Sequence, residues 1–336
     1  MIVSCGDCVN PTKENSMKLR GIDFGYVMNA SGGRNFFGDG YWFHRGLLPF
    51  GLDYTATTFV AKTTTLSERE GNMEFDWTTL QPLEHFPKCI KVRFAKGAVL
   101  NAVGLSGPGA KNLLKRGLWQ ERRVPFFISF AAVKETVTER LKEWQEFVSL
   151  LRRHVSEFHA RIGLEMNFSC PNTGIEKPLV DEILAALDIA AVLGIPLVVK
   201  LNILVTPMSA MRIERHSACD AICQSNTIPW GELSDLINWQ KIFGKKESPL
   251  KKYGGGGLSG PILFPLVANW ISRARALGFR KPIIGCGGIN SPRSAGLMFD
   301  AGASAIQIGS ASITRPWYVG RIVRYANAYA RKKYGA

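Results

Sequence analysis

The sequence predicts an α/β fold, a (β/α)8 TIM barrel with loop insertions at the top of the barrel. Eight short apolar, β-rich runs alternate with segments of helical length, an order typical of βαβ units and a parallel sheet. Several runs are continuously hydrophobic and end in polar residues, as expected of parallel strands buried on both faces. The length of 336 residues suits one large barrel with added segments. A doubly wound open sheet is the alternative.

The strands and helices of this barrel can be assigned in chain order. The predicted strands are 25–31, 58–65, 125–131, 164–169, 197–202, 221–226, 283–288 and 305–311. Apolar residues recur at helical spacing in the segments 135–153, 178–193, 264–277, 291–301 and 316–333. The third, fourth, sixth, seventh and eighth predicted strands are therefore each followed by a helix, which is the repeating unit of a barrel.

Three segments exceed what a minimal barrel needs: 32–57, 66–124 and 227–253. In barrel enzymes such insertions usually build the top of the active site or a lid over it. No internal repeat or linker marks a domain boundary. We therefore expect one barrel domain over 17–336, preceded by a flexible N-terminal extension over 1–16.

Composition excludes several classes of protein. With 46% hydrophobic and 21% charged residues, the chain is neither disordered nor fibrous. It has no apolar run long enough to span a membrane and no secretory signal, and its odd count of 7 cysteines argues against a disulfide scaffold. We expect a reducing, cytoplasmic location. Cys5 and Cys8 form a CxxC without a second pair or a histidine at zinc spacing, so no metal site is predicted.

The formal net charge of +15 favours anionic partners. These could be phosphate cofactors, acidic metabolites, nucleic acid or an anionic membrane surface, and a solvated basic face is the simplest interpretation. Composition alone leaves these possibilities open.

Polar side chains collect where the predicted strands end, which is where the working residues of a barrel stand. They include two lysines and four asparagines, Lys62, Lys200, Asn101, Asn167, Asn172 and Asn226. Each such group needs a hydrogen-bond partner if it is desolvated, so core filling does not explain the set. The sequence therefore predicts a polar site at the C-terminal rim.

Glycine-rich turns follow the last strands, at 254–261, 285–289 and 307–311. Glycine lets backbone N–H groups approach an anion closely, and the loops after strands seven and eight are the usual phosphate site of a barrel. These turns predict a phosphorylated cofactor or substrate, with ordinary turn glycines as the alternative.

The segment MNFSCPNTG at 166–174 places Cys170 directly after a buried strand and before Pro171. A partly exposed thiol near Lys62 or Lys200 could be tuned to take a proton. A structural cysteine is the alternative interpretation. The amide side chains around Cys170 favour a catalytic one.

Taken together and in order, these motifs resemble the dihydroorotate dehydrogenases, which are FMN-dependent (β/α)8 barrels. The resemblance runs from about Met17 to the C-terminal helix. It is carried by MNASG (28–32), AKTTTLSEREGN (61–72), NAVGLSGPG (101–109), MNFSCPNTG (166–174), VVKLN (198–202), QSNT (224–227), GGLSGP (256–261), IIGCGGI (283–289) and GASAIQIGSA (302–311).

The resemblance implies the oxidation of (S)-dihydroorotate to orotate in pyrimidine biosynthesis, with hydride passing from C6 to flavin N5. It implies that Cys170 takes the C5 proton, and a cysteine there marks the soluble class, whereas the membrane-bound, quinone-using class has serine. Lys62 matches a catalytic lysine between flavin and substrate. The substrate positions are Lys62, Asn101, Gly104, Leu105, Asn167, Asn172, Asn226 and Thr227. The FMN positions are Ala30, Ser31, Lys62, Thr63, Asn101, Asn167, Lys200, Ser225, Ser259, Gly260, Gly287, Gly288, Gly309 and Ser310.

Two other flavin barrels remain as alternatives, a dihydropyrimidine dehydrogenase or reductase and an RNA-modifying dihydrouridine synthase. Asn172 argues against the first, because that branch tends to carry histidine at the matching place. The net charge suits the second, but no RNA-binding domain is evident.

The electron acceptor is open between fumarate, a partner flavoprotein and another oxidant. No NAD fingerprint or iron–sulfur cysteine cluster occurs in the sequence, and the resemblance implies a possible homodimer. The chain departs from the family pattern in 32–57, in the lysine-rich 227–253 and at Asn202, where many relatives have proline.

Overall fold

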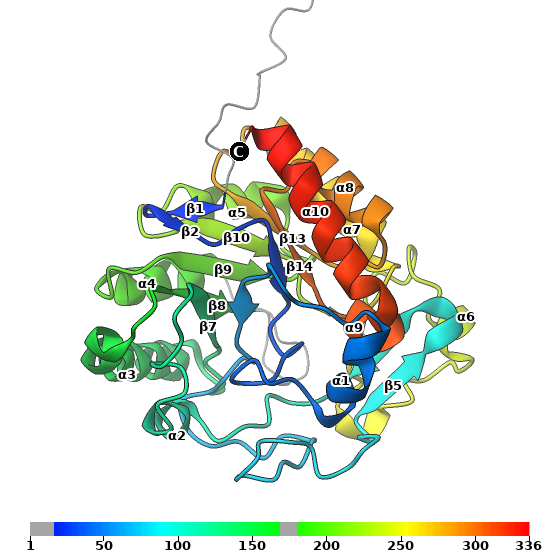
Figure 1. Ribbon diagram of the computed structural model, residues 1–336, viewed down its shortest axis with the longest axis horizontal. Coiled ribbons are helices and arrows are strands. Elements are labelled where there is room, and N and C mark those ends of the chain that lie inside the picture. The colour runs from blue at the N-terminus through cyan, green and yellow to red at the C-terminus, as the bar shows by residue number, and fades with distance from the viewer. Residues whose placement is uncertain (1–16, 169–179, 336) are drawn as a thin grey trace, which may run out of the picture.

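The computed structural model describes residues 17–168 and 180–335, and an eight-stranded parallel barrel lies at its centre (Figure 1). The strand order is β3-β14-β13-β10-β9-β8-β7-β4, and every neighbouring pair is parallel. The barrel strands are β3 (Val27–Asn29), β4 (Phe59–Val60), β7 (Phe126–Phe130), β8 (Ile162–Asn167), β9 (Leu197–Leu201), β10 (Ala221–Gln224), β13 (Ile283–Cys286) and β14 (Ala305–Ile308). All eight lie within or across the predicted runs, so the prediction of a TIM barrel is confirmed.

The barrel closes between β3 and β4, the first two strands in the chain. Thr58 N–H donates to the Val27 carbonyl at 2.9 Å, and Met28 and Thr58 form a parallel bridge. The Asn29 side chain donates to the Val60 carbonyl at 2.7 Å and accepts from the Val60 N–H at 3.1 Å, as a backbone amide would. This closure excludes the doubly wound alternative, which leaves two sheet edges open.

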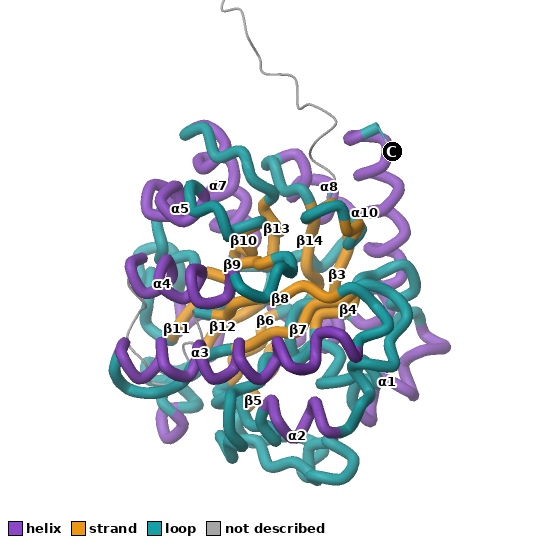
Figure 2. Tube along the Cα trace, turned by 90° about the vertical axis from the view of Figure 1, so that its left-hand side faces the viewer, coloured by secondary structure: helices purple, strands orange, loops and turns teal. Residues whose placement is uncertain are grey.

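Helices cover the outside of the barrel (Figure 2). They are α3 (Val137–His154), α4 (Val180–Ala191), α5 (Pro207–Glu214), α7 (Leu263–Ala276), α8 (Pro292–Asp300) and α10 (Val319–Tyr334). Several begin at polar caps: Thr136 and Glu139 form a capping box on α3, and Ser291 caps α8. The predicted helical segments are confirmed, except that 316–318 forms a separate 3-10 turn and that α5 was not predicted.

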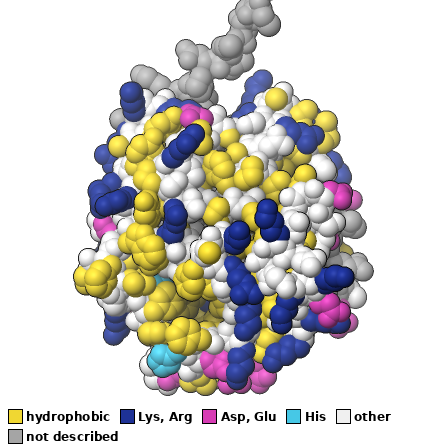
Figure 3. Space-filling model, turned by 90° about the vertical axis from the view of Figure 1, so that its right-hand side faces the viewer, with side chains coloured by type: hydrophobic (Ala, Val, Ile, Leu, Met, Phe, Trp, Pro, Cys, Tyr) yellow, Lys and Arg dark blue, Asp and Glu magenta, His cyan; other side chains and the backbone are white. Residues whose placement is uncertain are grey.

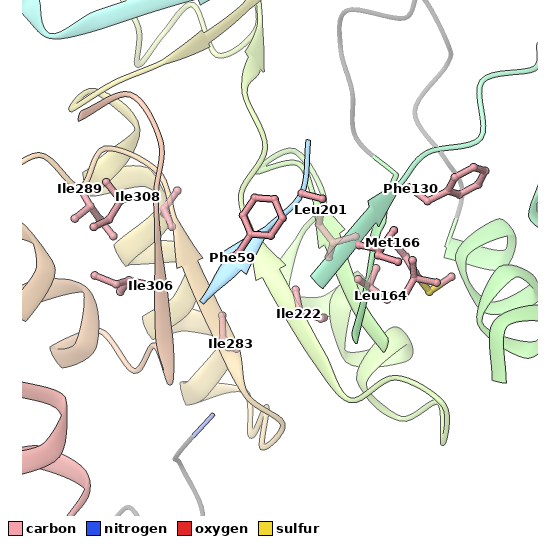
Figure 4. Packing of buried hydrophobic residues seen from close by; sticks show 14 of the residues in the cluster. Phe59, Phe130, Leu164, Met166, Leu201, Ile222, Ile283, Ile289, Ile306 and Ile308 are labelled. Atoms are coloured by element: carbon pink, nitrogen blue, oxygen red, sulfur yellow. The ribbon is translucent and has the colours of Figure 1, made fainter. Parts of the chain in front are cut away.

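The core has two parts. The larger cluster fills the space between barrel and helices, where residues such as Phe130, Met166 and Ile222 meet the inner faces of the helices (Figure 4). The smaller cluster fills the barrel interior and includes Phe24 and Phe127, whose rings lie 4.2 Å apart. A short hairpin, β1 (Lys18–Leu19) and β2 (Ile22–Asp23), brings Leu19 to the interior cluster.

The predicted insertions build a second sheet and several short helices. The four-stranded antiparallel sheet β11-β12-β6-β5 consists of β5 (Ile90–Arg93), β6 (Ala98–Asn101), β11 (Ile228–Pro229) and β12 (Gly257–Ser259). The short helices are α1 (Trp42–Leu47), α2 (Ala110–Lys115), α6 (Trp239–Phe243) and α9 (Ala311–Thr314). The 3-10 turns are η2 (Leu48–Phe50), η3 (Phe94–Lys96), η4 (Val155–Glu157), η6 (Lys251–Tyr253) and η7 (Pro316–Tyr318). Among the described residues, none of the helices combines the length and the apolar character that crossing a bilayer would require.

Candidate active site

A cavity of about 310 Å³ opens at the C-terminal ends of the barrel strands. It lies where the insertions meet the barrel, and its size is within the range of small-molecule sites. The predicted site residues that line it are Ala30, Ser31, Lys62, Thr63, Asn101, Gly104, Leu105, Asn167, Lys200, Ser225, Asn226, Thr227, Ser259, Gly287, Gly288, Gly309 and Ser310. One predicted residue, Gly260, is not in the lining. Cys170 and Asn172 lie outside the described residues, as do Cys5 and Cys8.

A chain of hydrogen bonds orients the amides on one side of the cavity. Asn226 Nδ2 donates to Asn167 Oδ1 at 2.8 Å, and Asn167 Nδ2 donates to Thr63 Oγ1 at 3.1 Å. Thr63 Oγ1 lies 2.9 Å from Ser129 Oγ, which in turn donates to Glu165 at 2.9 Å. Because each partner fixes the next, Asn167 and Asn226 hold set orientations before any ligand arrives.

Asn101 comes from the second sheet rather than from the barrel. It ends β6, where it pairs with Gly257 of β12 and Ile90 of β5. Its Nδ2 lies 3.4 Å from the Gly257 carbonyl. The antiparallel sheet therefore brings a further amide to the cavity that the barrel strands line.

Lys200 rises from β9 into the barrel interior beneath the cavity and is only 3% exposed. Its Nζ lies 3.0 Å from Ser31 Oγ, 3.2 Å from Gln307 Oε1 and 3.4 Å from Glu165 Oε1. Burial would lower the pKa of Lys200, but the Glu165 carboxylate together with the neighbouring Cys223 and Cys286 outweighs it, so that the pKa lies above its ordinary value. Lys200 is therefore a fixed positive charge in the floor of the site.

Lys62 is the second buried lysine of the cavity, with 5% of its surface exposed. Its ammonium donates to the Ser106 carbonyl at 2.5 Å and lies over the rings of Phe36 and Phe75, at 4.7 Å and 5.4 Å from their centroids. Carbonyl and ring faces both favour the charged form of a lysine. Lys62 follows β4, which the barrel closure places next to β3.

Glycine turns after β13 and β14 form a cradle in the lining of the cavity. Gly288 has φ +72°, and a Cβ there would lie 2.6 Å from the Phe264 nitrogen. A Cβ on Gly309 would lie 3.2 Å from the Ala30 Cβ. Within the described residues, the backbone N–H groups of Gly288, Gly309 and Ser310 donate no hydrogen bond. Such a set of close, unengaged N–H groups suits a phosphate.

Aromatic residues of α1 and the turn before it form one wall of the cavity, and the sequence did not predict them as site residues. Tyr41, Trp42, Phe43 and His44 line it, and the Tyr41 hydroxyl donates to the Gly32 carbonyl at 2.8 Å. Burial, and then the positive charge of Arg34, lower the pKa of His44 to about 4. His44 is thus neutral at physiological pH, and the wall is largely uncharged.

Three buried polar residues in the floor were also missed: Ser129, Glu165 and Gln307. Each is 1% exposed or less. Glu165 carried a signal, because a carboxylate within the apolar run of β8 requires a buried partner. Asn202, a departure from the family pattern, donates through Nδ2 to the Thr227 carbonyl at 2.6 Å and so supports the adjoining strand end.

The basic surplus of the sequence is visible on the surface. The face in Figure 3 carries many more Lys and Arg than Asp and Glu side chains, together with exposed hydrophobic groups. Exposed aromatics include Trp42 at 41% and Phe86 at 87%, with ring centroids 6.4 Å apart. Because Trp42 also lines the cavity, this exposed cluster adjoins the cavity mouth.

Comparison with known sequences identifies the relatives of the chain. Residues 49–328 match the model of the protein family described as dihydroorotate dehydrogenase. The catalytic subunit of dihydroorotate dehydrogenase B (NAD(+)) from Geobacillus kaustophilus is 32% identical over 241 residues, which cover 69% of this chain and 71% of the relative. The corresponding subunit from Streptococcus pneumoniae is 31% identical over 259 residues, covering 74% of this chain and 76% of the relative.

Solved structures agree on the fold. The DHODH of Eimeria tenella in complex with ferulenol superposes with a TM-score of 0.64 and 19% identity, covering 95% of this chain and 85% of that structure. The ligand-free structure from the same organism gives a TM-score of 0.66 and 17% identity, covering 97% and 89%. At such identity the likeness shows a shared barrel architecture.

Proposed function

The chain belongs to the dihydroorotate dehydrogenase family and is an oxidoreductase of that family. We propose that it oxidises (S)-dihydroorotate to orotate, with FMN as the cofactor and Cys170 as the base. One observation carries this proposal. Lys62, Asn101, Asn167 and Asn226 reach a single cavity that also contains the glycine cradle and Lys200. A polar pyrimidine subsite thus adjoins a phosphate subsite, as a reaction between a dihydropyrimidine and a flavin nucleotide requires.

The residues of the cavity fit FMN. The N–H groups of Gly288, Gly309 and Ser310 would hold the phosphate, and Ser31 and Lys200 would face the ring system. When bound, FMN supplies a two-electron acceptor for the hydride of the substrate. Lys200 contributes a fixed positive charge in a low-dielectric floor, where it stabilises the negative charge that the reaction delivers. Glu165 and Gln307 hold its ammonium in place.

The amide set suits the edge of a dihydropyrimidine ring. That edge alternates N–H and C=O groups, and an amide side chain can donate and accept at once. Asn167 and Asn226 are locked in register by their mutual hydrogen bond of 2.8 Å, so the ring would meet a preformed template. Lys62 would pair with the substrate carboxylate, and Gly104 and Leu105 would bound the ring.

We assign the abstraction of the substrate C5 proton to Cys170. In the proposed step the thiolate sulfur takes the proton from C5 while the hydride leaves C6, and the electron pair of the C5–H bond forms the C5–C6 double bond. The proton then passes from sulfur to water. Asn172, two residues further, is assigned to the substrate.

We propose that a separate protein accepts the electrons from the reduced flavin. The relatives from Geobacillus kaustophilus and Streptococcus pneumoniae are named as catalytic subunits of NAD(+) enzymes, and this sequence has no NAD fingerprint. We therefore propose a partner electron-transfer subunit in preference to fumarate. A cytoplasmic location accords with this assignment and with the cysteine usage of the chain.

Anaerobic reduction of the flavin tests the proposal. Dihydroorotate should bleach the FMN absorbance within seconds, whereas dihydrouracil, which lacks the carboxylate, should do so far more slowly. Bleaching by dihydrouracil alone would contradict the substrate assignment. After reduction by dihydroorotate, NAD alone should leave the flavin reduced; reoxidation by fumarate would contradict the proposed exit.

The Cys170→Ala variant tests the base. It should retain FMN but reduce it about 100-fold to 10,000-fold more slowly, which is the scale of general-base loss. Stopped-flow absorbance of the loaded enzyme measures this rate. The matched control is Cys219→Ala, because Cys219 is buried away from the cavity. Equal rates for Cys170→Ala and the wild type would reject the assignment.

A further inference from the structure

Two cysteines in the barrel interior have no role in the proposed reaction. Cys223 lies on β10 and Cys286 on the neighbouring parallel strand β13, where Cys223 is opposite Ile284. Both belong to the interior cluster, and Cys223 is fully buried. Cys286 is 8% exposed and lines the cavity next to Gly287 and Gly288 of the phosphate cradle. One thiol therefore reaches the site, and the other lies behind it.

The surroundings of the pair give the two thiols different roles. Cys223 Sγ donates to Gln307 Oε1 at 3.4 Å, and Lys200 Nζ lies 3.2 Å from the same oxygen. The neighbouring Cys223 side chain, and in addition the Lys200 charge, lower the pKa of Cys286 against the effect of burial. Burial raises the pKa of Cys223 well above its ordinary value. Of the two thiols, Cys286 therefore loses its proton more readily.

The other described thiols lack these features. Cys89 and Cys219 are buried and are not in the cavity lining. Burial raises the pKa of Cys89 to about 11 and that of Cys219 to about 12. Structural cysteines of this kind are inert, whereas a cavity thiol beside a lysine is the type that reacts. The chain therefore contains its own negative controls.

We propose that Cys286 is a modification site for soft electrophiles in the floor of the cofactor cavity, and that its modification and cofactor binding exclude each other. This inference rests on the proposed binding of FMN. With iodoacetamide, the Cys286 thiolate sulfur forms the new S–C bond, the C–I bond breaks, and iodide leaves; the thiol proton has gone to water. The added carbamidomethyl group occupies part of the cavity that Cys286 lines together with Gly287 and Gly288, where the cofactor would bind.

Site-resolved labelling tests the proposal. The protein is prepared with bound FMN and also stripped of it, both forms are treated with iodoacetamide, and each cysteine peptide is quantified by mass spectrometry over time. Cys286 should be labelled at least about tenfold faster in the stripped protein, and Cys89 and Cys219 should stay unlabelled in both. Stripped protein labelled at Cys286 should then have lost at least about tenfold in FMN affinity, whereas Cys286→Ser treated in the same way should bind FMN as before treatment.

Variants of the second thiol test the cooperation. Cys223→Ala removes the neighbouring polar side chain, so it should slow labelling of Cys286 at neutral pH and shift its rate profile to higher pH. Cys223→Ser keeps a polar side chain there and should restore most of the rate, and Cys219→Ala is the matched control. Absence of Cys286 labelling in stripped protein would overturn the proposal, as would equal labelling while FMN remains bound by its absorbance. Failure of the stripped protein to take up FMN at all would instead overturn the proposed function.

Discussion

The barrel interior has a lower half, at the N-terminal parts of the strands, and an upper half, at their C-terminal parts. The same strands supply apolar side chains to the lower half and polar side chains to the upper half. On β7 the inward side chain changes from Phe127 to Ser129, and on β9 it changes from Val198 to Lys200. Each change takes place two residues further along the strand, which is one step on the same face. The lower half is apolar, and the upper half is a hydrogen-bonded network around Glu165. Identical backbone geometry thus supports either packing or chemistry.

The two halves also differ in what holds them together. Apolar side chains gain stability roughly in proportion to the area that they bury, and any residue of similar shape can substitute. A buried ion pair gains little over an apolar replacement, but the loss of one partner leaves the other charge without compensation. The upper half should therefore tolerate single substitutions much less than the lower half.

The strongest test of this difference is Glu165→Ala. It leaves the Lys200 ammonium buried without its carboxylate and should lower the free energy of unfolding by about 3–5 kcal/mol. Urea unfolding monitored by circular dichroism measures the change. Glu165→Gln keeps the hydrogen-bonding shape and isolates the effect of charge. A loss below about 1 kcal/mol for Glu165→Ala would show that the network is not the weak point.

A second test compares Lys200 with His44, since both are buried beside the cavity. Lys200 stays charged because Glu165 faces it, whereas burial and the charge of Arg34 lower the pKa of His44 to about 4. Between about pH 6.5 and pH 4 the unfolded chain binds a proton at His44 that the folded chain does not, so acid favours unfolding. Stability should fall by up to about 3 kcal/mol across this window, and it should not change for this reason above it.

Unfolding curves of wild type and His44→Asn at several pH values measure the effect. The variant should show a flatter pH dependence between pH 6.5 and pH 4. The matched control is His85→Asn, because His85 is exposed at the cavity mouth. An unchanged slope in His44→Asn would show that the pKa of His44 is the same in the folded and the unfolded chain, which would contradict a buried neutral imidazole.

The same contrast explains what the sequence could predict. Each barrel strand can be predicted from its own residues, because a strand buried on both faces is a short apolar run such as PFFISFA at 125–131. The glycine cradle and Lys200 were likewise expected, since both stand at strand ends. The antiparallel sheet was not predicted, because Asn101 of β6 and Gly257 of β12 lie 156 residues apart and pair only in the folded chain. The contacts of Glu165 with Lys200 and Gln307 likewise join different strands of the barrel.

A third test concerns the glycine cradle, where backbone N–H groups, not side chains, are proposed to bind the ligand. Gly288→Ala places a Cβ 2.6 Å from the Phe264 nitrogen at a φ of +72°, which a side chain rarely adopts. We expect a loss of about 1–2 kcal/mol in stability, together with a larger relative loss in FMN affinity. Fluorescence titration of FMN measures the second effect. Gly278→Ala is the control, because its φ of +90° carries the same strain but nothing lies within 4 Å of its Cβ. Equal FMN affinity in both variants would remove Gly288 from the cradle.

The smallest effect is expected for a substitution in the apolar lower half of the barrel interior. Ile284 lies on β13 two residues before Cys286, is 1% exposed and belongs to the interior cluster. Ile284→Val removes one methylene and should cost about 1 kcal/mol by urea unfolding. FMN affinity and the rate of flavin reduction should stay unchanged, because the substitution is confined to the packing layer. If the reduction rate fell severalfold, the two halves of the interior would be mechanically coupled, and the division between packing and chemistry along each strand would not hold.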